Sequence, residues 1–164
     1  MAEGDLLRVF RALEAAQVRY LVVGGVAVVL HGYPRFTADL DLVVALDADN
    51  ARRALDALGT LGFQPRAPVP MAAFADLAQR EIWVTEKDLV VFSLWTPAMP
   101  LMEIDLFVRE PFPFDAAFAR RVSIDLGDVN VSVASIDDVI ELKRAVGRPK
   151  DLDDVRALEE IKKS

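Results

Sequence analysis

The stretch YLVVGGVAVVLHGYPRFTADLDLVV, residues 20–44, determines the predicted fold. Gly24 and Gly25 interrupt its first apolar run, and Asp39 and Asp41 lie inside its second apolar run. The β-branched segment before the glycines predicts a strand, and the apolar segment after them predicts a short buried helix that follows a tight turn. The second run predicts another strand, in which buried carboxylates are costly unless something compensates their charge.

The composition is typical of a globular protein. The chain has 164 residues, 53% of them hydrophobic and 27% charged, which fits a single domain, 1–164, with a substantial core. The absence of cysteine excludes disulfides, thiolate zinc sites and cysteine nucleophiles. The amino terminus, MAEGDLLRVF, lacks the pattern of a signal peptide. No apolar run reaches the roughly 18 residues of a membrane helix, so we expect a cytoplasmic protein with no membrane partner.

The charge distribution bears on the choice of partners. A net charge of −7 argues against nonspecific binding of polyanions, which depends on clustered Lys and Arg. Residues 143–150, KRAVGRPK, hold four basic residues and no acid. This segment is either a local basic site or a solvated helix end.

Hydrophobic periodicity predicts a mixed central β-sheet flanked by helices, in the α/β or α+β class. Strands and helices alternate early, strands cluster in the middle, and a helical segment of about 135–164 closes the chain. A short helix is expected within 63–79, and Lys87-Asp88 is expected to turn a hairpin. The predicted helices are 5–17, 26–32, 50–62, 136–146 and 150–163, and the predicted strands are 19–23, 39–46, 81–86, 89–95, 101–108, 121–126 and 129–134.

Two pairs of carboxylates fall on predicted strands. Because side chains alternate across a strand, Asp39 and Asp41 share one face, and so do Glu103 and Asp105. If they converge, their mutual repulsion needs a counter-charge. Divalent cations supply it, since carboxylate oxygens are ligands that Mg²⁺ prefers. With His31 as the only imidazole, a zinc or iron site is poorly supplied.

The glycine pair suggests what lies beside these carboxylates. At the start of a helix, Gly24 and Gly25 let backbone N–H groups approach an anion closely. A triphosphate held there and bridged by metal to Asp39 and Asp41 would form a phosphoryl-transfer arrangement. The sequence contains neither G-x-x-x-x-G-K-[ST] nor G-x-G-x-x-G. The alternatives are a tight packing turn for the glycines and helix caps or exposed strand ends for the aspartates.

These residues resemble a known family. GGVAVVLHGYPRFTADLDLVV and the later EIDLF are similar to the motifs of the nucleotidyltransferase superfamily with the DNA polymerase beta-like fold. The tail ELKRAVGRPKDLDDVRAL resembles the closing segment of the AbiEii-type toxin branch, close to the minimal nucleotidyltransferases of toxin–antitoxin loci. The resemblance covers residues 20–44, 101–107 and 139–158, and it implies the nucleotidyltransferase fold with a helical C-terminus.

The resemblance also implies an activity. A magnesium-dependent enzyme would transfer a nucleoside monophosphate from a nucleoside triphosphate to an acceptor hydroxyl. Asp39, Asp41 and Asp105 would be the catalytic residues and would bind two Mg²⁺ ions, with Mn²⁺ as an alternative. Asp105 would also take the acceptor's proton, and Gly24 and Gly25 would hold the β- and γ-phosphates.

Five further residues are candidates for nucleotide binding. Arg35 is expected to contact phosphate or acceptor, because a guanidinium fork suits phosphate oxygens. Thr37 is expected to orient its loop, and Lys143 and Lys150 to reach the triphosphate. Asp151 is the favoured aspartate of the closing segment, where the resemblance places an active-site acid. Solvated surface positions are the alternative for each of these side chains.

The expected acceptor is RNA, most plausibly a tRNA end, or a protein hydroxyl. Full-length toxins of this type often carry an extra helical domain, for which this chain leaves little room. An antitoxin, a helical partner protein or a second copy of the chain is therefore expected to complete the site. Two other functions remain open from the sequence. One is a nucleotide-binding regulatory or antitoxin module with little turnover, and the other is a structural partner subunit.

Overall fold

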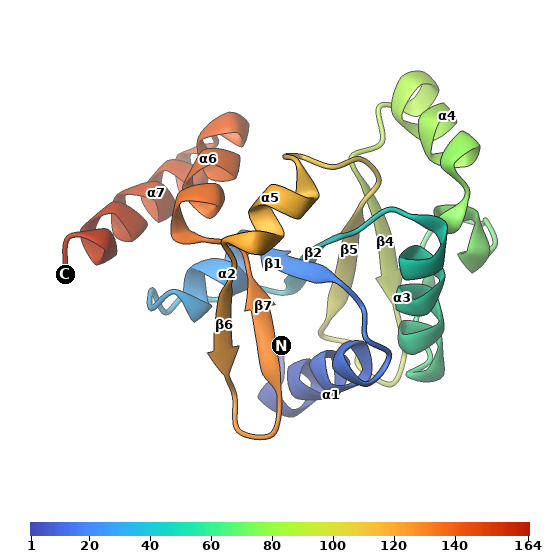
Figure 1. Ribbon diagram of the computed structural model, residues 1–164, viewed down its shortest axis with the longest axis horizontal. Helices are drawn as coiled ribbons and strands as arrows, with labels where there is room; N and C mark the ends of the chain where they lie inside the picture. Colours follow the sequence, from blue (N-terminus) through green and yellow to red (C-terminus); the bar gives the residue numbers. More distant parts are fainter.

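A seven-stranded mixed sheet lies at the centre of the structure, a computed structural model that describes residues 1–164 (Figure 1). The strand order is β3-β4-β5-β2-β1-β7-β6. The strands are β1 (Tyr20–Val23), β2 (Asp39–Val44), β3 (Gln64–Pro65), β4 (Val91–Trp95), β5 (Glu103–Phe107), β6 (Val122–Asp125) and β7 (Asn130–Val133). The predicted mixed sheet flanked by helices is therefore confirmed.

Seven α-helices and one 3₁₀ helix surround this sheet. They are α1 (Glu3–Ala15), α2 (Gly24–Leu30), α3 (Ala48–Thr60), η1 (Met71–Ala75), α4 (Leu77–Lys87), α5 (Phe114–Ala119), α6 (Ile136–Val146) and α7 (Pro149–Lys162). In Figure 1 the paired helices α6 and α7 lie toward one end of the molecule, while α3 and α4 lie toward the other. No helix of the structure has the length and apolar character needed to cross a lipid bilayer.

The central strands of the sheet are β5, β2 and β1. Strand β1 runs antiparallel to β2, β2 runs parallel to β5, and β5 runs antiparallel to β4. Alternate residues of β2, β5 and β4 are buried, and they belong to the main core; they are Leu40, Leu42, Ile104, Leu106, Phe92 and Leu94. The side chains between them point to the opposite face, which is only partly covered.

One predicted hairpin is wrong in its first half. Residues 81–86, expected as a strand, belong to helix α4, and only the second half forms a strand, β4. Arg80 and Trp83 are the buried residues of α4, a spacing of three that is helical rather than strand-like. Trp83 stacks on Phe92 of β4 with ring centroids 5.1 Å apart. The side chain of Asp76 caps the helix by accepting a hydrogen bond from the Ala78 N–H.

The closing helices agree with the sequence prediction. The Ser135 hydroxyl accepts a hydrogen bond from the Asp138 N–H at the start of α6. Gly147 ends that helix with a left-handed φ of 70°. Pro149 then occupies the first turn of α7, where its missing N–H costs nothing. This short connection places the first turn of α7 beside the last turns of α6.

Candidate active site

The predicted carboxylates lie on the partly covered face of the sheet, on two adjacent parallel strands. Asp39 of β2 pairs in register with Glu103 of β5, and Asp41 pairs with Asp105. Both pairs therefore project from the same face, as the alternation of side chains predicted. On the far side of β5, Ser93 of β4 pairs with Asp105, and its hydroxyl donates a 2.6 Å hydrogen bond to Asp105 Oδ1.

The environment of Asp41 disfavours its charged form. Burial and the neighbouring charges of Asp105 and Asp39 raise the pKa of Asp41 to about 7, although Lys143 lowers it in part. Burial also raises the pKa of Asp105, against the opposing effect of the Ser93 hydrogen bond. The two carboxyl groups are within hydrogen-bonding reach of one another. No basic side chain of the protein forms a salt bridge with either of them; within the protein, a proton on Asp41 and the hydrogen bond from Ser93 to Asp105 offset their charge.

Gly24 faces these carboxylates directly. It begins α2 with a φ of 68°, and a Cβ at this position would clash with Asp41 Oδ2. Glycine is therefore required here both by backbone conformation and by space. At Gly25 a Cβ would lie 2.7 Å from Thr37 Oγ1 and 3.0 Å from Arg35 Nη2. The glycine pair thus lets two separate segments of the chain approach the start of α2.

No side chain caps the start of α2, whose N-cap residue is Val23. The first N–H groups of a helix have no partner within the helix, so at this end no side-chain acceptor satisfies them. An anion site at the glycines stays a prediction.

Charged residues of α6 and α7 form the opposite wall. Lys143 is buried, and its Nζ lies 2.9 Å from Asp154 Oδ2 and 3.4 Å from Asp151 Oδ1. Arg148 binds Asp151 through Nε at 2.7 Å. Although burial raises it, the pKa of Asp151 is held below its ordinary value by Arg148 and Lys143. Arg35 binds Asp154 at 2.9 Å through Nη2, so two buried acids hold three cations in place.

A cavity of about 180 Å³ lies between Asp41 and this wall. Residues of the sheet and its glycine turn line one side, and residues of α6, α7 and their connection line the other. The polar lining residues are Asp41, Lys143, Arg148 and Asp151, with Gly24 beside them. Val91, Phe107, Leu142 and Val146 supply an apolar side. The cavity therefore joins the glycine turn, one metal-ligand candidate and the basic segment predicted from the sequence.

The remaining predicted residues do not line this cavity; Arg35 and Thr37 line another one, beside Val26 and Leu30 of α2. The Thr37 hydroxyl donates to the backbone carbonyl of Asp39 at 3.2 Å, which fixes the loop before β2. Arg35 Nε is buried without a hydrogen-bond partner. Lys150 is exposed on the first turn of α7 and does not line the cavity. His31 caps α2, and its Nε2 bonds the Ala134 carbonyl, which indicates a structural role.

Sequence reasoning missed three residues of this site. Arg148 lies within the basic segment but had not been singled out, and Asp154 had been passed over for Asp151. Asp151 and Asp154 are both buried, and both bind Lys143. Ser93 gave no signal in the sequence, because its contact with Asp105 depends on how β4 pairs with β5.

The donor chemistry of the site fits a divalent cation. No group of three or more His, Asp or Glu side chains is arranged to hold a metal ion without further ligands. Mg²⁺, however, is usually bound by one or two carboxylates together with water and substrate phosphates rather than by a cage of protein ligands. Asp41 and Asp105, paired in register and close to the glycine turn, supply two such carboxylates.

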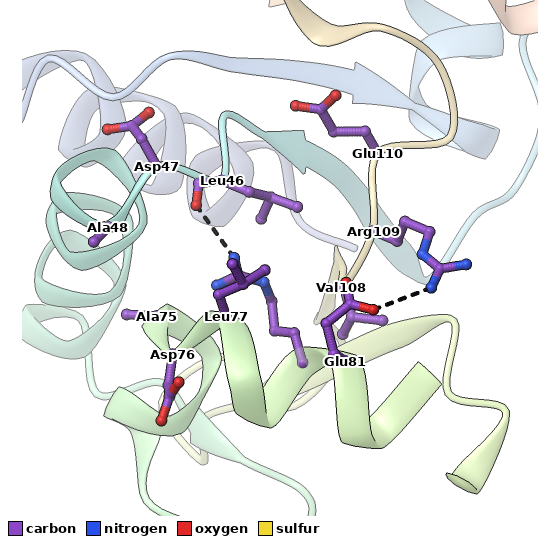
Figure 2. A pocket seen from close by; sticks show the side chains of 11 residues that line it. Leu46, Asp47, Ala48, Ala75, Asp76, Leu77, Glu81, Val108, Arg109 and Glu110 are labelled. Carbon is purple, nitrogen blue, oxygen red and sulfur yellow. Dashed lines mark hydrogen bonds and ion pairs between the residues drawn. The ribbon is translucent and has the colours of Figure 1, made fainter. Parts of the chain in front are cut away.

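The largest cavity lies elsewhere. It measures about 750 Å³ and lies where Leu46 and Val108 follow β2 and β5, at the ends of these strands away from Asp39 and Glu103 (Figure 2). Its charged side chains already have partners. Glu81 binds Arg109 at 3.4 Å, and Arg80 donates to the carbonyls of Phe74 and Leu46. None of the predicted site residues lines this cavity.

Three solved structures share this fold over most of their length. The lincosamide antibiotic adenylyltransferase LnuA, solved with lincomycin bound, is 16% identical, with 98% of each chain covered and a TM-score of 0.66. ANT(2'')-Ia, solved in complex with adenylyl-2''-tobramycin, is 12% identical over 97% of this chain and 91% of its own, with a TM-score of 0.59. An antigenic nucleotidyltransferase-like protein from Paracoccidioides brasiliensis is 20% identical over 95% of this chain and 73% of its own, with a TM-score of 0.55.

No protein-family model matches the sequence, and no curated protein matches it. At identities this low, the three structures establish the nucleotidyltransferase fold, and they confirm the predicted fold class. The AbiEii-type branch stays a prediction.

Proposed function

We propose that this protein is a nucleotidyltransferase, which moves a nucleoside monophosphate from a nucleoside triphosphate to an acceptor hydroxyl and releases pyrophosphate. The observation that carries the proposal is the Asp41–Asp105 pair, in register on β2 and β5 and directly beside the Gly24 turn. Neither carboxylate forms a salt bridge within the protein, and Asp105 is held only by the hydrogen bond from Ser93. The similar folds of the lincosamide antibiotic adenylyltransferase LnuA and of ANT(2'')-Ia, solved with adenylyl-2''-tobramycin, support the same reaction.

Different residues of the site would bind different parts of the nucleotide's triphosphate. Gly24 and Gly25 would offer backbone N–H groups to the β- and γ-phosphates. Lys143 and Arg148, on the facing wall of the cavity, would neutralise phosphate charge. Asp151 would act through these two cations, because its carboxylate is buried and bonded to both.

The loop before β2 would contribute a further contact. Arg35 would contact phosphate or acceptor through its guanidinium, which is partly exposed and bound to Asp154. Thr37 would hold this loop by its bond to the Asp39 backbone. Lys150, which is exposed on α7, would contact the triphosphate from outside the cavity.

Asp39, Asp41 and Asp105 would hold two Mg²⁺ ions, or Mn²⁺ in their place. When bound, such ions stabilise both the attacking and the leaving oxygen in a displacement at phosphorus. Asp105 would also accept the proton of the acceptor hydroxyl.

The acceptor proposed from the sequence is an RNA, most plausibly a tRNA end, or a protein hydroxyl, within a toxin–antitoxin system that supplies a helical partner. LnuA and ANT(2'')-Ia bind or modify small antibiotics. A small-molecule hydroxyl is therefore a second acceptor to test, and the net charge of −7 favours it over a polyanion.

The test is label transfer. The purified protein would be incubated with Mg²⁺ and each α-labelled nucleoside triphosphate, with total RNA, cell lysate, lincomycin or tobramycin as the acceptor. Asp41→Asn serves as the control. We expect label in one acceptor class with the wild type alone. Magnesium-dependent nucleotide binding without transfer would favour the regulatory-module alternative, and the absence of both would refute the proposal.

A further inference from the structure

The carboxylates on the open face of the sheet have different partners. Glu103 forms a salt bridge with Arg66, whose Nε and Nη2 lie 3.2 and 3.1 Å from Glu103 Oε2. Asp105 instead accepts its 2.6 Å hydrogen bond from the uncharged hydroxyl of Ser93. The structure therefore neutralises Glu103 and holds Asp105 without neutralising it.

We propose that Ser93 is a positioning residue of this site, which orients the Asp105 carboxylate for metal binding and for contact with the acceptor. The inference rests on the proposed function, because it assigns Ser93 a role through Asp105. No comparison or sequence motif points to this serine. It follows from the pairing of β4 with β5 and from the hydrogen bond between the two side chains.

A neutral donor suits this position for a physical reason. A lysine or arginine at 93 would pair with Asp105 and compete with a cation for its charge. An apolar side chain would leave Asp105 free to rotate away from Asp41, whose charge repels it. A hydroxyl restrains the carboxylate through Oδ1 and leaves Oδ2 and the net negative charge available.

The backbone of β4 makes this restraint rigid. Ser93 and Asp105 are paired in the middle of an antiparallel ladder that runs from Val91↔Phe107 to Trp95↔Glu103. On the other face of β4, Phe92 and Leu94 are buried in the core. The strand therefore cannot shift without disrupting core packing, so the serine hydroxyl is held at a fixed distance from its partner.

The matched variants are Ser93→Val and Ser93→Thr. Valine and threonine have nearly the same shape and both favour strands, so the pair differs mainly in the hydroxyl. The control is Ser132→Val, at another half-buried position on a strand of the same sheet, β7. The probe is Mn²⁺, titrated in the presence of a non-hydrolysable nucleoside triphosphate and followed by electron paramagnetic resonance, with thermal unfolding measured beside it.

We expect Ser93→Val to weaken Mn²⁺ binding by about 10- to 100-fold, the usual effect of removing a partner of a metal ligand. Ser93→Thr should restore it, and Ser132→Val should leave it unchanged. In the transfer reaction at saturating Mn²⁺, kcat should fall in Ser93→Val while KM for the nucleotide changes little.

Equal Mn²⁺ affinity in wild type and Ser93→Val would overturn the role of Ser93, while leaving the proposed function in place. If Ser93→Thr binds as weakly as Ser93→Val, the hydroxyl is not what matters, and the inference also fails. A wild type that binds no Mn²⁺ with the nucleotide present would instead contradict the proposed site itself.

Discussion

Asp41 and Asp105 lie opposite one another on two hydrogen-bonded parallel strands, with no basic side chain forming a salt bridge with either. Burial, together with the nearby charges of Asp105 and Asp39, raises the pKa of Asp41 to about 7. Two carboxylates in this position oppose folding whenever both are ionised. A protein keeps such a pair at a functional site, where a ligand compensates the charge, more readily than in a purely structural role.

This pair predicts an unusual dependence of stability on pH. The ordinary pKa of Asp41 is 3.8, and in the folded protein it is about 7. Because the folded state binds this proton more tightly than the unfolded chain does, its contribution to stability is complete below about pH 4 and is lost as the pH rises through about 7. With chelator present, the wild type should therefore lose stability relative to Asp41→Asn over this range.

Thermal unfolding of both proteins between these pH values measures the effect. At pH 8 we expect the Tm of Asp41→Asn to exceed that of the chelated wild type by about 5 °C, which corresponds to one or two kcal/mol for a chain of this size. Adding Mg²⁺ should raise the Tm of the wild type and not that of the variant. A constant difference at all pH values would show that the Asp41 carboxylate is not destabilised.

Gly24→Ala tests the contact between the glycine turn and the carboxylates. The added Cβ would clash with Asp41 Oδ2, and the left-handed φ of 68° is unfavourable for alanine. We expect a loss of stability of at least about 1 kcal/mol and a larger proportional loss of metal-dependent nucleotide binding.

Gly59→Ala is the matched control for that substitution. Gly59 lies in α3, and a Cβ there would meet no atom within 4 Å. The change should be neutral or stabilising by up to about 1 kcal/mol, since alanine favours helices. If Gly24→Ala bound nucleotide as well as Gly59→Ala does, the turn would not form part of the site.

Lys143→Met and Lys150→Met separate a buried cation from an exposed one. Lys143 lines the cavity and binds Asp151 and Asp154, so its removal should weaken nucleotide binding and lower the Tm. Lys150 is exposed, and its contact with the triphosphate would be screened by salt. We expect its smaller effect to disappear at high ionic strength. Calorimetric titration of the nucleotide at two salt concentrations measures the affinity of each variant. Equal losses of affinity in Lys143→Met and Lys150→Met would contradict the arrangement of the cavity.

Much of the fold could be predicted because local signals agree with the tertiary structure. The glycines after an apolar strand, the Ser135 cap and the left-handed Gly147 each mark an element boundary that the structure keeps. The segment at 81–86 was misread because Ile82 and Val84 suggest strand alternation. The stacking of Trp83 on Phe92, which favours the helix, is a tertiary contact that the sequence does not show.

The positions of site residues on strands could be predicted from the sequence, whereas the ion pairs between helices α6 and α7 could not. Alternation alone puts Asp39 and Asp41 on one face. By contrast, Asp151 and Asp154 lie one turn apart in α7, and the structure makes both of them partners of Lys143. Which acid meets which cation depends on how α6 packs on α7, and this could not be read from spacing.

The central claim is that Asp41 belongs to a metal-dependent nucleotide site, and a binding titration with matched variants tests it most directly. A non-hydrolysable nucleoside triphosphate would be titrated into wild type, Asp41→Asn and Glu103→Gln, in Mg²⁺ and in chelator. Glu103 is a matched carboxylate of the same open face, already paired with Arg66. We predict that the wild type binds the nucleotide in Mg²⁺ and not in chelator. The affinity in Mg²⁺ should fall more than tenfold in Asp41→Asn and stay the same in Glu103→Gln. Binding that survives both the chelator and Asp41→Asn would contradict the account.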